Sequence, residues 1–167
     1  MAEYEAFINA KNKIEGRAHL SKFLRKAWAD GGDSCPGKVY SGSSQDDYVK
    51  AHYFDIELAA HAVCNMSGPK PSKAYLETIR EALRETENWR WMTQKRNTKE
   101  TTWVKQILAA SGSEKVVVDG HFKSKIERQK QWVESHRGDL GAGFITQVEI
   151  ILNNVQIEGE SSPCSIM

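Results

Sequence analysis

Apolar residues recur three and four positions apart along most of this chain, which is the spacing of one face of an α-helix. The clearest such stripe consists of Leu20, Phe23, Leu24, Ala27 and Trp28. A helix with one apolar face must bury that face against a neighbouring element. Repeated stripes separated by Gly, Pro and Ser therefore predict an all-α fold, a compact single-domain bundle of about six or seven helices.

The breaks between the stripes divide the chain into elements. Gly16 is expected to interrupt the first stripe, and residues 31–45 are expected to form a loop. Val116–Val118 is β-branched and short, so a short extended segment is predicted near 115–118. In the last element, alternation at Val148, Ile150 and Leu152 also fits a strand, although a helix is preferred. The predicted helices cover about residues 4–14, 20–30, 44–65, 72–86, 99–110, 122–136 and 144–157.

The composition is that of an ordinary globular protein, with 40% apolar and 27% charged residues. The net charge of +1 provides no global attraction for nucleic acid. No apolar run is long enough to span a membrane, and the N-terminus has no secretory signal. Three scattered cysteines fit a reducing compartment. We therefore expect a cytoplasmic protein with one helical domain over residues 1–157 and a flexible tail over 158–167.

The chain ends in a prenylation motif of the C-a-a-X type, made of Cys164, Ser165, Ile166 and Met167. A cysteine fourth from the end and a terminal Met are the features that farnesyltransferase recognises. The tetrapeptide resembles the tails of farnesylated proteins such as the nuclear lamins. That resemblance covers four residues and implies a lipid on Cys164. It also implies reversible association with the cytoplasmic face of membranes, or with a prenyl-binding partner.

The sequence next to this motif is acidic. Residues 138–167 contain four acids and neither Lys nor Arg. A single lipid chain binds membranes only marginally, and adjacent acids are repelled by anionic headgroups. Attachment is therefore expected to be weak. The mildly basic helix over 122–137 is a candidate membrane or partner surface, but a solvated helix face is the preferred interpretation.

A second constellation combines aromatic and basic residues, namely Trp89, Arg90, Trp91, Lys95, Arg96 and Lys99. Such surfaces bind single-stranded nucleic acid through stacking and phosphate neutralisation. Because nearby glutamates dilute the charge, half-buried tryptophans at helix ends are the more ordinary explanation. A small nucleic-acid-binding protein is kept as an alternative function.

Glu57, His61 and Cys64 share one face of the predicted third helix, at spacings of four and three. They could ligate zinc, or His61 could activate Cys64 as a nucleophile. A core-edge position is favoured instead, since Cys is commonly buried. No metal or cofactor is predicted, and the chain lacks a phosphate-binding glycine motif. The leading hypothesis is a farnesylated cytosolic interaction or adaptor protein with a protein partner; an enzyme of unrecognised type is the last alternative.

Overall fold

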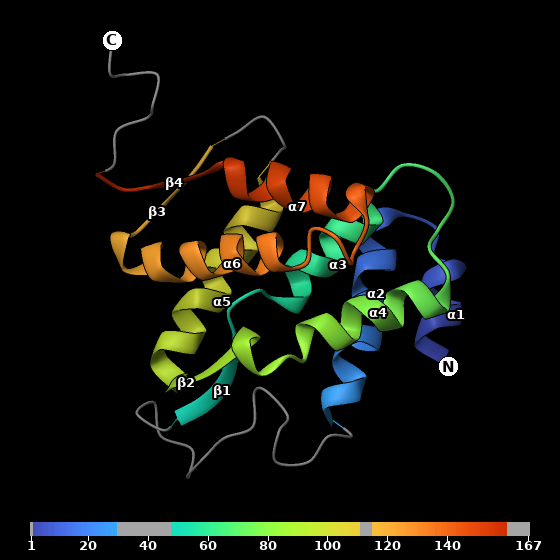
Figure 1. Cartoon of the computed structure of the whole chain (residues 1–167), viewed down its shortest axis with the longest axis horizontal. Helices are drawn as coiled ribbons and strands as arrows, with labels where there is room; N and C mark the ends of the chain where they lie inside the picture. The colour runs from blue at the N-terminus through green and yellow to red at the C-terminus, as the bar shows by residue number, and fades with distance from the viewer. Residues whose placement is uncertain (1, 30–47, 111–114, 160–167) are drawn as a thin grey trace.

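The computed structural model describes residues 2–29, 48–110 and 115–159, and Figure 1 shows their arrangement. The described part is mostly helical, as predicted. It also contains two small two-stranded sheets, so the fold is not purely all-α. The described elements are α1 (Ala2–Ile8), α2 (Lys13–Ala29), β1 (Tyr48–His52), α3 (Ile56–Cys64), α4 (Lys73–Leu83), the 3₁₀ turn η2 (Thr86–Asn88), β2 (Trp89–Thr93), α5 (Gln94–Ala109), β3 (Val116–Val118), the 3₁₀ turn η3 (Gly120–Phe122), α6 (Lys123–Ser135), α7 (Ala142–Asn153) and β4 (Val155–Ile157).

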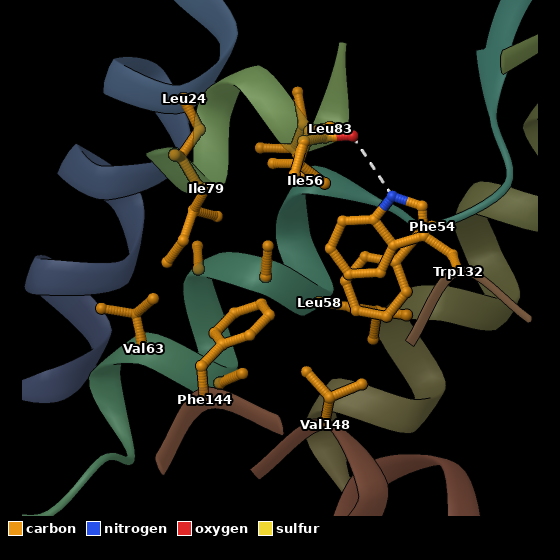
Figure 2. Packing of buried hydrophobic residues seen from close by; sticks show 14 of the residues in the cluster. Leu24, Phe54, Ile56, Leu58, Val63, Ile79, Leu83, Trp132, Phe144 and Val148 are labelled. Carbon is orange, nitrogen blue, oxygen red and sulfur yellow. Dashed lines mark hydrogen bonds between the residues drawn. The ribbon is translucent and has the colours of Figure 1, made fainter. Parts of the chain in front are cut away.

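Helix α3 lies at the centre of the hydrophobic core, with other helices packed around it (Figure 1). It is apolar on nearly all sides, which is the pattern of a helix enclosed by others. Its buried residues are Ile56, Leu58, Ala59, Ala60, Ala62 and Val63. In Figure 2, Leu24 of α2, Ile79 of α4 and Phe144 of α7 converge on it.

Trp132 of α6 closes one side of this core. Its ring stacks on Phe54 with centroids 4.2 Å apart, and its Nε1–H donates to the carbonyl oxygen of Ala82 at 3.2 Å. Most of the stripe residues predicted to face the core are buried, but Tyr53 and Leu108 are half-buried, Ile14 is 74% exposed, and the side chain of Trp28 lies outside the described part. Those confirmed are Phe23, Leu24, Ile56, Ile79, Leu83, Trp103 and Ile107.

The predicted helix over 44–65 is wrong in its first half. Residues 48–52 form β1, which pairs antiparallel with β2, and α3 begins only at Ile56. The pairing partner for this segment is Trp89–Thr93, which was expected to be an irregular basic turn. Backbone groups that pair across a sheet are unavailable to a helix. Because β2 ends at Thr93, whose side chain accepts from the Arg96 N–H, α5 starts about five residues earlier than expected.

The N-terminal stripe also divides differently from the prediction. Helix α1 ends at Ile8, where the Lys70 ammonium donates to the Phe7 and Ile8 carbonyl oxygens, both at 2.7 Å. Helix α2 then runs through Gly16 without interruption. A Cβ at Gly16 would lie at ordinary contact distance from the Phe7 ring and the Cys64 sulfur, 3.7 and 3.8 Å away, so the packing here does not demand glycine, and the glycine does not break the helix.

The extended segment near 115–118 is confirmed as β3, which pairs in parallel with β4. The helix predicted over 144–157 is therefore too long at its end, because α7 stops at Asn153 and residues 155–157 form β4. The Glu158 N–H extends this pairing by donating to the Val118 carbonyl oxygen at 2.7 Å. The predicted loop over 31–45 and most of the tail lie outside the described residues.

Candidate functional site

A buried charge cluster holds two of the residues predicted to contact nucleic acid. Glu100 is 1% exposed and accepts from Arg90 Nη2 at 2.6 Å and from Arg96 Nε at 3.3 Å. Lys125 is 2% exposed; its Nζ lies 3.5 Å from Glu100 Oε2 and 2.9 Å from Asp55 Oδ1. Three cations thus share two carboxylates. Arg90 and Arg96 are bound to Glu100 within the folded protein, so their first role is structural.

The sequence reasoning missed Asp55, Glu100 and Lys125 as members of a cluster. Burial raises the pKa of the Asp55 carboxyl, whereas the neighbouring Lys125 ammonium lowers it. One signal was available, because Glu100 precedes Trp103 and Ile107 at helical spacing and so belongs to the buried face of α5. Lys125 gave no such signal, since a lysine on an amphipathic helix is ordinarily exposed.

The two tryptophans of the constellation lie on the opposite face of β2 from Arg90. Trp89 and Trp91 are two residues apart, and their rings meet edge-on with centroids 6.4 Å apart. Trp91 is 42% exposed and Trp89 is half-buried. Arg90 points inward, with its guanidinium 4.4 Å from the centroid of the Tyr53 ring. The strand therefore separates the aromatic pair from the arginine, and no single stacking platform combines them.

The remaining cations, Lys95, Arg96 and Lys99, lie together at the start of α5. With Thr93, Asp119, His121 and Phe122 they line a cavity of about 250 Å³, here named the α5–η3 pocket. Arg96 Nη2 donates to the His121 carbonyl oxygen at 2.7 Å, which joins the two walls. Lys95 and Lys99 are exposed and form no ion pair with any residue in the described ranges.

On the other side of α5, a cleft of about 570 Å³ opens toward α2 and α3 and is here named the α2–α5 cleft. Its polar lining includes Arg17, Arg25, His52, Asp55, Glu57, Asn97, Thr101 and Lys105. Successive residues turn by about 100° along a helix, so the residues of α5 on this cleft face away from those on the α5–η3 pocket. Burial, followed by Lys125 and Arg25, lowers the His52 pKa well below its ordinary value. Its imidazole is therefore neutral at pH 7.

Glu57, His61 and Cys64 lie on one face of α3, but each meets a different neighbour. Glu57 accepts from Arg25 Nη2 at 3.0 Å and from the Ser21 hydroxyl at 2.8 Å. His61 Nδ1 lies 3.2 Å from a guanidinium nitrogen of Arg17. Burial raises the pKa of the half-buried Cys64 thiol, so it is protonated at neutral pH and a poor nucleophile. Across the described ranges, no three His, Cys, Asp or Glu side chains gather as a metal site would require.

The prenylation motif, Cys164 to Met167, lies outside the described residues, so farnesylation stays a prediction. Among the helices that the structure describes, none is both long enough and apolar enough to cross a membrane. The chain matches no protein-family model, and comparisons with curated proteins and with solved structures find no match.

Proposed function

We propose that this chain is a cytosolic helical interaction protein that is farnesylated on Cys164. The lipid attaches the folded part reversibly to a membrane or to a prenyl-binding partner. The observation that carries the proposal is the C-terminal tetrapeptide of Cys164, Ser165, Ile166 and Met167. The proposal takes Met167 as the natural C-terminus, which the intact mass of the native protein tests.

The position of the last strand supports this function. The final backbone bond of the β3–β4 sheet is made by Glu158, six residues before Cys164. Six extended residues reach about 20 Å, which is enough to carry a cysteine away from the folded part into an enzyme cleft. The intervening sequence is polar and contains Gly159 and Pro163.

The direct experiment is the intact mass of the protein purified from a eukaryotic host. We expect one farnesyl adduct, which the C164S variant should lack. The C64S variant is the matched control and should keep the adduct, since Cys64 is half-buried in α3. An unmodified full-length mass in the presence of active farnesyltransferase would refute the proposal.

A second candidate function is the binding of a small organic anion in the α2–α5 cleft. Its carboxylates are already balanced, because Glu57 pairs with Arg25 and Asp55 pairs with Lys125. Within the described part of the chain, Arg17 and Lys105 have no carboxylate partner. Ile56, Val104 and Leu108 add an apolar wall that suits the body of such a ligand.

Benzoate is a suitable probe for this cleft, because it combines a carboxylate with an apolar ring. We expect amide chemical-shift changes at α2 and α5 during a titration. The K105Q variant should weaken them, whereas K95Q, on the other face of α5, should not. Equal behaviour of the two variants would exclude the cleft as the binding site.

Nucleic-acid binding has less support from the geometry. Arg90 and Arg96 are engaged by Glu100, which leaves Lys95, Lys99 and the exposed Trp91 as possible contacts. Salt-dependent binding to a random oligonucleotide is the test that would favour it.

A further inference from the structure

The β3–β4 pairing decides where the tail leaves the folded part. Because the Glu158 N–H donates to the Val118 carbonyl oxygen, residue 158 lies beside residues 118 and 119. Asp119 is also a wall residue of the α5–η3 pocket. In Figure 1, β4 ends at the same end of the molecule as the start of α6. Glu158, the point from which the tail continues, therefore lies beside a wall residue of the pocket, although it is far from Lys99 in sequence.

The lysines of the pocket lie close enough to act on this region electrostatically. Two hydrogen bonds from His121 lower the pKa of the Asp119 carboxyl, and the charges of His121 and Lys99 lower it further. Asp119 is thus ionised, and its carboxylate accepts a hydrogen bond from the backbone N–H of His121 at 2.8 Å. Lys95 and Lys99 stay exposed beside it and form no ion pair with described residues.

The charge cluster beneath the pocket does not cancel these lysines. Arg90, Arg96 and Lys125 share only two carboxylates, those of Glu100 and Asp55. The buried cluster is therefore itself positive overall. With Lys95 and Lys99 added, and Asp119 and Glu158 set against them, five cations face four acids, so this region carries a positive excess of one charge.

We propose that the α5–η3 pocket and its two exposed lysines form a binding surface for anionic lipid headgroups. The inference rests on the proposed farnesylation, because the lipid on the tail holds this surface against the membrane. A single prenyl chain needs a second signal for stable attachment, and a basic surface is one such signal. The tail sequence lacks this signal, and the fold supplies it from α5.

The surface has two further features that suit a membrane interface. Val117 of β3, which pairs with Gln156 of β4, is 59% exposed and offers one apolar side chain on this side of the sheet. The Arg96 side chain is bonded to Glu100 and to the His121 carbonyl oxygen, so it fixes the walls of the pocket and leaves the headgroup contacts to Lys95 and Lys99.

The experiment measures binding of the full chain to phosphatidylcholine vesicles with and without phosphatidylserine, in farnesylated and C164S forms. One Lys near an anionic surface strengthens binding about fivefold. We expect K95Q/K99Q to weaken binding to phosphatidylserine vesicles about 10–25-fold in both forms, without affecting neutral vesicles. The matched control K11Q/K22Q removes two exposed lysines elsewhere and should bind like the parent. Raised salt should reproduce the loss.

The two proposals fail in different ways. If the protein carries no farnesyl group, the proposed function fails, while the C164S form still tests the surface. If C164S binds phosphatidylserine vesicles no better than neutral ones at low salt, or K95Q/K99Q binds like K11Q/K22Q, the surface is not a lipid site. Tighter binding to a random single-stranded oligonucleotide than to phosphatidylserine vesicles, lost in K95Q/K99Q, would assign it to nucleic acid and overturn the lipid proposal.

Discussion

The fully buried side chain of Asn88 holds both backbone groups of Phe54, a residue 34 positions earlier in the chain. Its Oδ1 accepts from the Phe54 N–H at 2.7 Å, and its Nδ2 donates to the Phe54 carbonyl oxygen at 3.2 Å. Nδ2 also donates to the Leu83 carbonyl oxygen at 2.9 Å. This one amide provides hydrogen-bond partners for both backbone groups of Phe54, in the extended segment between β1 and α3. It also joins that segment to the end of α4.

Replacing Asn88 with Ala should lower the free energy of unfolding by at least about 2 kcal/mol, because buried Phe54 backbone groups would be left without partners. Urea denaturation followed by circular dichroism measures this change. N153A is the matched control, since Asn153 is exposed at the end of α7, and it should stay within about 0.5 kcal/mol of the parent. Equal midpoints for the two variants would contradict the assigned role.

Leu83→Ala should cost about 2–5 kcal/mol, because Leu83 has 0% exposure and its removal leaves a cavity in the core. Ile150, by contrast, is 45% exposed on α7, so I150A should cost far less. Chemical denaturation of both variants makes the comparison. A small effect at Leu83 would mean that α4 is not packed against α3 as described.

Glu100→Gln should destabilise the fold by about 3 kcal/mol or more, because it leaves the buried Lys125 charge with Asp55 as its remaining acid. The matched control is E134Q, which breaks an exposed, solvent-screened pair with Arg137 and should cost far less. Thermal or urea unfolding reports both effects. Similar losses in the two variants would indicate that the cluster is solvated.

Acidification below about pH 6.5 should destabilise the protein partly through His52. The folded state lowers the His52 pKa below its ordinary value of 6.5, through burial and then through Lys125 and Arg25. In this range the unfolded chain therefore binds more protons than the folded chain, and stability falls as pH falls. The H52Q variant should show a shallower loss between pH 6.5 and pH 5 in denaturation curves. An unchanged slope would show that His52 protonates freely in the folded protein.

Most of the helices could be predicted because helical periodicity is local. The stripes that contain Leu24, Ile79 and Ile107 were identified from spacing alone, and each of these residues is buried. The β-branched run at Val116–Val118 likewise indicated an extended segment. In these segments the backbone preference and the apolar pattern agree, so no distant partner is needed to choose the structure.

The sequence alone thus determined the helical class, most of the core stripes and a C-terminal tetrapeptide of the prenylation type that follows an acidic stretch. Only the tertiary structure decided that Tyr48–His52 is a strand, because its partner β2 and the Asn88 side chain come from distant parts of the chain. It also decided that Lys125 is buried beside Glu100, since a lysine on an amphipathic helix is ordinarily exposed and gives no signal of burial. The pairing of β4 with β3 had the same kind of consequence, because it placed the start of an acidic tail beside Asp119 and the lysines of α5. Charges that are remote along the chain act on one another only through such spatial proximity.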